Sequence, residues 1–503
     1  MARPLTTPWP TTPGSVFFGD VASAATLSRA VKDGRIRRLA RGLYSADLRA
    51  DPAELVARNR WVIVARLLPD AIIADRSAAE GGMPTAGVLT VVSNARREPV
   101  ELPGLVIVPR PGPGPLADDP GWAEGLRLTS EARALVDNLA VSRGRRGRIA
   151  RTLSKAEIED WVVRTSQRRP SDWLLSLRAR ALEVCDELGV PERRPQVEEV
   201  IGVAAGTRAA RTGAGHLLAA RAAGREYDPD RVARFDDIAS FLLAMPDELD
   251  IPGDLPGLPD ETATSLPFFE AYFSNFIEGT EFSVDEAEAI VESGEIPASR
   301  PEDAHDILGT FEAVRDPELR TAVPSTSDEL FALLERRHRL VMGGRPDKRP
   351  GRFKETPNQA GSYIFVAPEL VEGTLIEGFR RLADLPPGFA RAAFELFVIS
   401  EVHPYDDGNG RVARAAMCAE LSAAGQARIV IPIAFRNEYQ TALRALSREG
   451  RTDLYVRTLA HAWRWTAAMP WGDRAAVAGH LVATNALVDS TDAERSGVRL
   501  VLP

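Results

Sequence analysis

The sequence contains little cysteine and no long hydrophobic run. Only two cysteines, Cys185 and Cys418, occur among its 503 residues, which does not favour a disulfide framework. No apolar segment approaches the roughly 18 residues that a membrane-spanning helix requires. The N-terminus also lacks the basic segment, apolar stretch and small-residue cleavage site of a secretory signal. These absences predict a cytoplasmic protein that does not have a membrane as a partner.

The length and the charge distribution predict several domains with different partners. Domains typically contain about 100 to 200 residues, so the chain is expected to form two to four of them. Residues 1–200 contain 30 basic and 25 acidic residues, whereas the rest of the chain contains 32 and 46. Such asymmetry indicates a module that faces nucleic acid, joined to a module of another kind. Ordinary scatter of surface charge is the alternative.

Proline content and apolar spacing separate the two halves of the chain. Five prolines and six acidic residues between Pro246 and Pro267 predict an extended connection that leads into a helix. Beyond this connection, apolar residues such as Leu330, Leu334 and Val341 recur at helical spacing. The second half is therefore predicted to be predominantly α.

The most informative segment lies between His403 and Arg414 and reads HPYDDGNGRVAR. Two glycines flank Asn409 where the chain is expected to enter a helix, so backbone N–H groups there can face an anion. Arg411 and Arg414 are three residues apart, share a helical face and suit the outer phosphates of a nucleotide. Asp407 offers a hard oxygen ligand for Mg²⁺, and His403 offers a base near neutral pH.

This segment resembles the signature of the Fic family, H-x-F-x-[D/E]-G-N-G-R-x-x-R, with Tyr405 in place of the usual phenylalanine. The resemblance covers residues 260–470 and implies an all-α Fic (Fido) core with a β-hairpin flap. It implies transfer of AMP from ATP to a hydroxyl of a target protein, with His403 as general base and Asp407 as the Mg²⁺ ligand. It also implies contacts to the α- and β-phosphates from Gly408, Asn409 and Gly410, and to the outer phosphates from Arg411 and Arg414.

Two flanking segments extend the resemblance. Residues 351–368 mix turn residues with a strand-like stretch and resemble the flap, the hairpin on which the target's backbone docks. Residues 436–447 stand where family members have adenine contacts, which makes Tyr439 and Ser447 candidates for nucleotide binding. Packing of Tyr439 in the core is the alternative.

A short segment before the motif resembles the inhibitory helix of the family. Residues 274–279, SNFIEG, match the pattern [S/T]-x-x-x-E-[G/N], and we expect the helix over residues 270–282. Ser274 and Glu278 are four residues apart and would share one face. The resemblance implies that the carboxylate of Glu278 pairs with Arg414 and withholds it from the γ-phosphate. A solvated glutamate on a surface helix is the alternative.

The front of the chain resembles a different family. Residues 26–46, TLSRAVKDGRIRRLARGLYSA, resemble the winged-helix start of AbiEi-type antitoxins and transcriptional regulators. The pattern predicts a short helix, a stop at Gly34 and a strand–turn–strand with Gly42 in the turn. In such an α/β module, a helix enters the major groove and the wing contacts phosphate. DNA contacts are then expected from Arg29, Lys32, Arg35, Arg37, Arg38 and Arg41. A winged helix that contacts only protein is the alternative.

We therefore expect a winged helix-turn-helix over 1–60, an AbiEi-like remainder over 61–195, a linker and helical lead-in over 196–259, a Fic domain over 260–475 and a C-terminal tail over 476–503. The predicted function is a protein adenylyltransferase that is inhibited by Glu278 and joined to a DNA-binding module. The alternative is a DNA-binding regulator or fused toxin–antitoxin protein whose Fic core senses nucleotide or removes AMP. Self-association is left open by the sequence.

Overall fold

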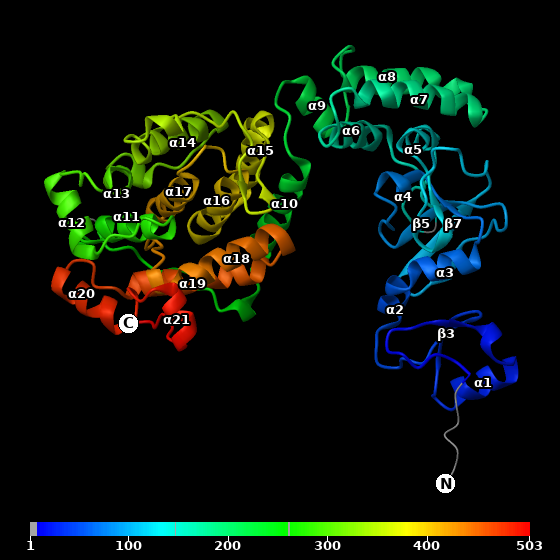
Figure 1. Ribbon diagram of the computed structural model, residues 1–503, viewed down its shortest axis with the longest axis horizontal. Coiled ribbons are helices and arrows are strands. Elements are labelled where there is room, and N and C mark those ends of the chain that lie inside the picture. Colours follow the sequence, from blue (N-terminus) through cyan, green and yellow to red (C-terminus); the bar gives the residue numbers. More distant parts are fainter. Residues whose placement is uncertain (1–7, 146, 260–261) are drawn as a thin grey trace, which may run out of the picture. The chain divides into compact units, whose positions relative to one another are not determined.

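The chain divides into two units, one ending at Ala223 and the other beginning at Gly224 (Figure 1). The structure is a computed structural model and describes residues 8–145, 147–259 and 262–503. Parts of three predicted segments, namely residues 1–7, residue 146 and residues 260–261, lie outside the described residues. In the part of the chain that is described, no helix is long and apolar enough to cross a membrane.

Among its described residues, the first unit combines two small sheets with nine α-helices. Its strands are β1 (Phe17–Phe18), β2 (Arg37–Ala40), β3 (Leu43–Ser45), β4 (Ile72–Ile73), β5 (Val88–Val92), β6 (Val100–Leu102), β7 (Leu105–Arg110) and β8 (Arg127–Leu128). Its α-helices are α1 (Ala24–Lys32), α2 (Pro52–Arg58), α3 (Arg60–Leu67), α4 (Asp75–Ala79), α5 (Glu131–Asn138), α6 (Lys155–Ser166), α7 (Trp173–Glu187), α8 (Arg194–Ala204) and α9 (His216–Ala222).

The predicted helix and strand–turn–strand at the front are confirmed. Ser23 caps α1 by accepting a hydrogen bond from the N–H of Thr26, and Leu27 and Ala30 form its buried face. Strands β2 and β3 pair antiparallel across a turn in which Gly42 has a φ of 78°. Strand β1 adds to β3, which gives a three-stranded sheet in the order β1-β3-β2.

The second sheet of this unit has five strands in the order β6-β7-β5-β4-β8. Its central pair, β5 and β7, is parallel, whereas β5 pairs antiparallel with β4. All five residues of β5 are buried, so this strand forms the centre of the core. Most of α8 and all of α9 lie within the range predicted as a linker and helical lead-in, residues 196–259, and the division between the two units also lies within it.

The second unit is almost entirely helical. Its helices are α10 (Pro229–Ala244), α11 (Leu266–Ile277), α12 (Val284–Ser293), α13 (Pro301–Arg315), α14 (Ser327–Val341), α15 (Val371–Asp384), α16 (Phe389–Val402), α17 (Asn409–Ala423), α18 (Arg436–Glu449), α19 (Thr452–Ala468), α20 (Arg474–Ala483) and α21 (Ser490–Ser496). Its two strands, β9 (Gln359–Ala360) and β10 (Tyr363–Ile364), form an antiparallel hairpin.

Helices α16 and α17 form the centre of the second unit and pack against each other along their length (Figure 1). Almost every residue of both helices is buried, as expected for helices that other helices surround. Helix α14 buries Leu330, Leu334 and Val341, as their spacing predicted. The loop between α16 and α17, which contains His403, is thus held between two helices of the core.

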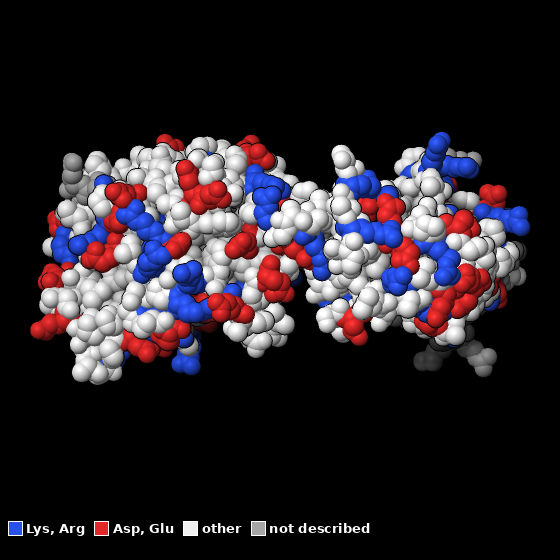
Figure 2. Space-filling view, turned by 90° about the horizontal axis from the view of Figure 1, so that it is seen from above, with Lys and Arg blue, Asp and Glu red and all other residues white. Residues whose placement is uncertain are grey.

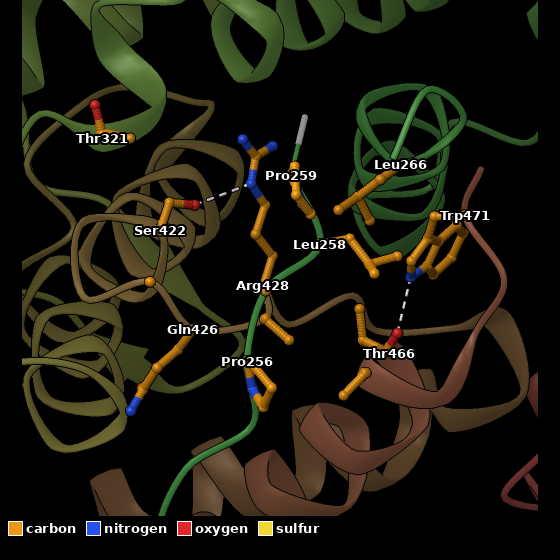
Figure 3. A pocket seen from close by; sticks show the side chains of 14 residues that line it. Pro256, Leu258, Pro259, Leu266, Thr321, Ser422, Gln426, Arg428, Thr466 and Trp471 are labelled. Atoms are coloured by element: carbon orange, nitrogen blue, oxygen red, sulfur yellow. Dashed lines mark hydrogen bonds between the residues drawn. The ribbon is translucent and has the colours of Figure 1, made fainter. Parts of the chain in front are cut away.

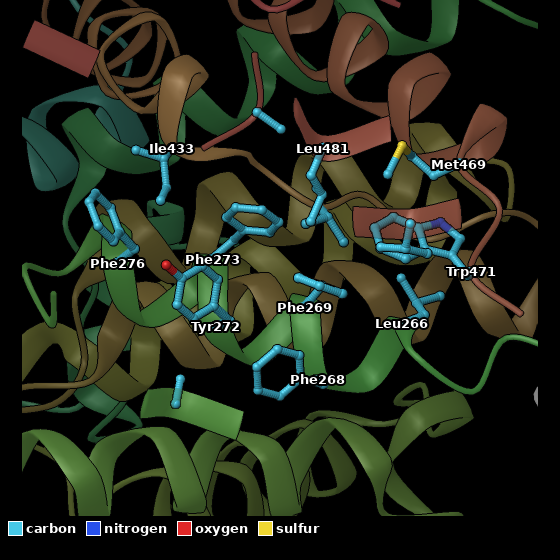
Figure 4. Close-up of a cluster of buried hydrophobic side chains, with 14 of the residues drawn as sticks. Leu266, Phe268, Phe269, Tyr272, Phe273, Phe276, Ile433, Met469, Trp471 and Leu481 are labelled. Carbon is cyan, nitrogen blue, oxygen red and sulfur yellow. The ribbon is translucent and has the colours of Figure 1, made fainter. Parts of the chain in front are cut away.

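Aromatic side chains of α11 anchor that helix in a large apolar cluster (Figure 4). Phe269 and Phe273 are fully buried and lie close to Trp471 and Trp465. Residues 476–503, predicted as a tail, form α20 and α21, and Leu481 of α20 joins the same cluster. The segment is therefore packed into the second unit, because its apolar residues recur at helical spacing.

The inhibitory helix that was predicted over 270–282 has different bounds. Helix α11 begins at Leu266, where Pro267 occupies the first turn, and ends at Ile277. Glu278 is its C-cap residue, and Gly279 follows with a φ of 96°, a conformation that favours glycine. Glu278 therefore lies at the end of the helix, where the chain turns away.

Candidate active site

A cavity of about 520 Å³ in the second unit brings together six of the predicted site residues. These residues are Glu278, His403, Gly410, Arg414, Tyr439 and Ser447. Ser274, Asp407, Gly408, Asn409 and Arg411 do not line this cavity. The cavity is therefore lined by the end of α11, the hairpin β9–β10, the end of α16 with His403, the first turns of α17, and α18.

The loop from His403 to Gly408 turns the chain sharply between α16 and α17. His403 (φ 53°) and Gly408 (φ 74°) are both left-handed, and α17 begins at the next residue, Asn409. The side chain of Asn409 accepts a hydrogen bond from the N–H of Tyr405 and donates one to its carbonyl, at 2.8 and 2.9 Å. Asn409 thus holds the loop closed with its side chain, and only backbone groups are left at this helix N-terminus for an anion.

His403 presents one ring nitrogen that can accept a proton. Its Nδ1 lies 3.3 Å from the carbonyl oxygen of Ser400, which can only accept, so Nδ1 carries the hydrogen and Nε2 keeps its lone pair. The ring of Phe365 stacks on the imidazole at 3.8 Å between centroids. Burial lowers the pKa of His403 to about 4, although the bond to the Ser400 carbonyl opposes this shift. The imidazole is therefore neutral at pH 7.

Arg414 and Glu278 form an ion pair at the wall of the cavity. A nitrogen of the Arg414 guanidinium lies 2.7 Å from Oε1 of Glu278, and the same guanidinium donates to the hydroxyl and the carbonyl of Ser274. The Arg414 side chain is 7% exposed, whereas that of Glu278 is 35% exposed. Burial raises the pKa of the Glu278 carboxyl, but Arg414 and its neighbours hold it below its ordinary value. Glu278 is therefore charged at neutral pH.

Gly410 allows the Glu278 carboxylate to lie directly against the first turn of α17. A Cβ atom at position 410 would lie 2.2 Å from Oε1 of Glu278, much closer than atoms can approach. The carboxylate thus stands at a helix N-terminus, where the helix dipole and unpaired N–H groups favour a negative charge. An anionic ligand that bound at this helix N-terminus would therefore compete with the Glu278 carboxylate for the same space.

Arg411 has a different environment from the one that the motif suggested. Its side chain is 2% exposed, forms an ion pair with Asp306 of α13 at 2.6 Å and contacts the amide oxygen of Asn275 at 3.3 Å. A second nitrogen lies 3.4 Å from Asp407. Only Arg414 of the two predicted arginines faces the cavity. Asp306 lies about a hundred residues before the motif, and no local pattern could have revealed it.

Asp407 and His338 form the outer side of the loop. The carboxylate of Asp407 is 44% exposed and accepts from the N–H of Gly408. The N–H of Gly351 donates to Nδ1 of His338, so Nε2 carries the hydrogen and donates to the carbonyl of Asp407 at 3.1 Å. The His338 ring also stacks on Tyr405 at 3.7 Å. Sequence reasoning missed His338, whose helical position indicates only a core residue.

Of the two carboxylates of the loop, Asp406 pairs with Arg349 at 2.8 Å, which leaves Asp407 as the candidate metal ligand. Among the described residues, no group of three or more His, Cys, Asp and Glu side chains could hold an ion by itself. Mg²⁺ commonly binds one or two carboxylates and completes its shell with water and phosphate oxygens. The exposed carboxylate of Asp407, next to a helix N-terminus, fits that arrangement.

The hairpin β9–β10 closes one side of the cavity and is held by a buried carboxylate. Glu401 accepts hydrogen bonds from the hydroxyls of Tyr363 and Ser447, the second at 2.7 Å, and forms an ion pair with Arg231 of α10 at 3.1 Å. Arg231 also lies over the ring of Tyr363. Neither Glu401 nor Arg231 was a sequence candidate, because their contact joins segments far apart in the chain.

A second cavity of the same unit, of about 260 Å³, shares no lining residue with the first (Figure 3). Trp471 and Leu266 form its apolar side. Its charged lining residue, Arg428, donates to Ser422 at 3.0 Å and to the buried carboxylate of Glu270 at 2.8 Å. Its polar groups serve the packing of α11 and α17, and we assign it no chemistry.

The predicted DNA contacts lie on α1, the following turn and the β2–β3 hairpin. Five of the six basic side chains are exposed, namely Arg29, Lys32, Arg35, Arg38 and Arg41. Arg37 is half-buried and donates to the carbonyls of Leu48 and Ala50, which ties the hairpin to the segment that follows it. Over the face shown in Figure 2, basic and acidic side chains are interspersed.

The motif region matches a known family. The model of the Fic/DOC family matches residues 329–421. A protein adenylyltransferase fic-1 from Caenorhabditis briggsae is 29% identical over 184 residues, which are 35% of this chain and 36% of that protein. A protein adenylyltransferase Fic from Nematostella vectensis is 26% identical over 221 residues, 43% of this chain and 50% of that protein. The chain thus spans between a third and a half of the length of these relatives.

Solved structures with the same family name are also similar. Fic-1 from C. elegans is 20% identical, covers 66% of this chain and 90% of its own, and has a TM-score of 0.36. A Fic domain containing signaling protein from Bacteroides thetaiotaomicron is 16% identical, covers 50% of this chain and 97% of its own, and also has a TM-score of 0.36.

The tyrosine in place of the family's phenylalanine generates a stability prediction. Tyr405 is fully buried, and its hydroxyl has no hydrogen-bond partner among the described residues. Because an unsatisfied buried hydroxyl costs roughly 1 to 3 kcal/mol, we expect Tyr405→Phe to raise the free energy of unfolding by about 1 kcal/mol. Urea unfolding of the full chain measures the change.

Tyr455 provides the matched control. It is also fully buried, but its hydroxyl donates to the carbonyl of Ala393 at 2.8 Å. Tyr455→Phe should therefore lower the free energy of unfolding by about 1 kcal/mol. Equal changes in the two variants would show that the Tyr405 hydroxyl has a partner after all.

Proposed function

We propose that the chain, whose residues 329–421 match the model of the Fic/DOC family, is a protein adenylyltransferase, which transfers AMP from ATP to a hydroxyl group of a target protein. The observation that carries this proposal is the meeting of three features at one cavity. They are an imidazole with a free Nε2, a helix N-terminus that can receive an anion, and an arginine aimed at the same space. The names of the similar proteins support the choice of AMP as the transferred group.

In the proposed reaction, His403 is the general base. Nε2 takes the proton from the acceptor hydroxyl as its oxygen forms a bond to the α-phosphorus of ATP. The bond from this phosphorus to the oxygen that bridges to the β-phosphate breaks, and pyrophosphate leaves. The reaction requires a neutral imidazole, and the low pKa of His403 supplies one across the physiological range.

The phosphates are proposed to lie along the first turn of α17. The backbone of Gly408, Asn409 and Gly410 meets the α- and β-phosphates, and Arg414 meets the γ-phosphate. Arg411 would have to leave Asp306 to join them. Asp407 would hold Mg²⁺, which when bound neutralises phosphate charge and favours departure of pyrophosphate.

The far end of the cavity is proposed to receive the nucleoside. Tyr439 and Ser447 line it from α18. Tyr439 is buried, and it contributes to the raised pKa of Arg414, so it lies between the nucleoside and the phosphates in the proposed arrangement. The hairpin β9–β10 is proposed as the flap on which the target's backbone docks.

The first test of this function is His403→Ala. We expect incorporation of labelled AMP to fall by about 10²- to 10⁴-fold, because a positioned base is lost. ATP affinity, measured by calorimetry, should stay within about twofold, because the imidazole does not contact the phosphates in the proposed arrangement. Turnover near that of the parent protein would remove His403 from the mechanism.

We further propose that Glu278 inhibits the enzyme. Arg414 can pair in bidentate geometry with either the γ-phosphate or Glu278, and one guanidinium cannot do both. In the structure it is paired with Glu278 and Ser274. ATP would then bind without its outer phosphate in place, and its α-phosphate would not be aligned with the acceptor.

Glu278→Gly should therefore activate transfer. Removal of the carboxylate frees Arg414 and the space above Gly410, so AMP incorporation should rise by about tenfold or more, for an ion pair worth a few kcal/mol. Labelled ATP with a cell extract measures incorporation. The double variant Glu278→Gly with His403→Ala is the control and should show none of the increase.

The same substitution tests removal of AMP, the reverse activity. Glu278 and His403 line one cavity, so the carboxylate could orient a water molecule toward a modified target. Glu278→Gly should abolish such removal while it increases transfer. Equal AMP incorporation by the parent and by Glu278→Gly would contradict inhibition by Glu278 and leave the transferase proposal standing.

For the first unit we propose DNA binding through α1 and the β2–β3 hairpin. The five exposed basic side chains there can reach phosphates, whereas Arg37 is occupied by backbone carbonyls. Replacement of Arg29, Arg35, Arg38 and Arg41 by Gln should reduce affinity. It should also flatten the double-logarithmic salt dependence by about 0.9 for each phosphate that the variant no longer neutralises.

Fluorescence anisotropy with genomic DNA fragments at several salt concentrations measures this slope. Arg178→Gln on α7 is the control, because Arg178 pairs with Glu198 and lies in another part of the unit. An unchanged slope in the fourfold variant would mean that this face does not contact DNA.

A further inference from the structure

The backbone of His403 is held in a conformation that histidine adopts at a cost. Its φ and ψ are 53° and 60°, in the left-handed region where the Cβ atom crowds the following carbonyl. Such conformations persist in folded proteins only where surrounding contacts determine them. The contacts that hold His403 should therefore lie on the peptide groups around it.

Two residues at the base of the hairpin bind the carbonyls on both sides of His403. The N–H of Lys354 donates to the carbonyl of Pro404 at 2.9 Å, and its ammonium nitrogen lies 3.4 Å from the carbonyl of Val402. The amide of Asn358 donates to the carbonyl of Tyr405 at 2.9 Å. The Lys354 ammonium also donates to the amide oxygen of Asn358 at 2.7 Å, which joins the two residues into one clamp.

Burial of the charged Lys354 side chain costs folding free energy, which a merely structural role does not explain. Its side chain is among the buried charged groups, at 3% exposure, and no carboxylate lies within ion-pair distance of it among the described residues. Burial lowers the pKa of Lys354 to about 8, so the ammonium remains charged at neutral pH without an ionic partner in contact. A neutral side chain would fill this space at lower cost, but it could not bring a positive charge to the imidazole.

Several groups face His403 from the elements around it. Phe365, at the end of the hairpin, stacks on the ring, and its N–H donates to the carbonyl of Asn358 at 3.2 Å. The positive charge of Lys354 disfavours the imidazolium form, whereas the Ser400 carbonyl and the carboxylates of Glu278 and Asp407 favour it. The hairpin base thus determines both the direction of the ring and part of its charge environment.

We propose that Lys354 and Asn358 are positioning residues that hold His403 in its left-handed turn and direct Nε2 into the cavity. The proposal rests on the proposed role of His403 as the base. In this proposal the base of the hairpin fixes the conformation of the loop that carries His403. This role is separate from any contact that the hairpin makes with a target.

The test uses the full-length Glu278→Gly protein as the parent, with Lys354→Met, Asn358→Ala and Lys354→Arg added separately. Methionine keeps the length of the side chain without its charge, and arginine keeps the charge. For Lys354→Met and Asn358→Ala we expect kcat for AMP incorporation to fall by about 10- to 100-fold, with affinity for a nonhydrolysable ATP analogue within twofold. Lys354→Arg should keep most of the kcat of the Glu278→Gly parent.

Two further measurements do not depend on activity. Hydrogen exchange of peptides that cover residues 402–408 should become faster in Lys354→Met and Asn358→Ala. The chain has only six histidines, so the His403 ring can be assigned by ¹³C NMR with a His403→Asn variant. Lys354→Met should raise the pKa of His403 by about 1, whereas Lys354→Arg should leave it near the parent's value.

The outcomes separate this inference from the proposed function. Unchanged exchange together with an unchanged His403 titration would overturn the clamp, as would a fall in ATP affinity that parallels the fall in kcat, since that indicates general loosening of the site. If the Glu278→Gly parent incorporates no AMP, the proposed function fails, and exchange and titration still decide whether Lys354 and Asn358 position His403.

Discussion

The second unit depends on the reversal of the chain between α16 and α17. Six residues, His403 to Gly408, join two helices that are buried along almost their whole length, and the loop needs a left-handed residue at each end. Its backbone groups are satisfied by side chains from three directions: Asn409 from within, His338 from α14 and the hairpin base from the other side. Because this loop has so many partners, the groups that face the cavity are fixed before any ligand arrives.

Helix α11 connects that site to the core. Its aromatic side chains pack in the large apolar cluster, while its last turn brings Ser274 and Glu278 to Arg414. Asn275 reaches Arg411 from the same helix. Movement of this helix out of the core would expose several phenylalanines to water. The ion pair between Glu278 and Arg414 can therefore break only by a rotation of the Glu278 side chain or by a change in the turn at Gly279.

The features of the fold and of the candidate site that depend on local sequence could be predicted. The features that depend on contacts between distant segments could not. The turn into α17 at Asn409, the helical face of Leu330 and Val341, and the strand–turn–strand around Gly42 each depend on residues close together in the chain. The pairing of Arg411 with Asp306, by contrast, requires α13 to lie beside α17, which no local pattern specifies. Lys354 escaped notice for the same reason, because a lysine in a polar segment looks solvated until the fold buries it.

The close approach of Glu278 to Gly410 makes these two positions mutually dependent. A methyl group at position 410 would clash with the Glu278 carboxylate, since the two cannot occupy the same space. Any side chain acquired at 410 would therefore displace the Glu278 carboxylate, and a shorter residue at 278 would leave room for a side chain at 410. In an evolving lineage, the permitted residues at 410 would thus depend on the history of a position more than a hundred residues earlier.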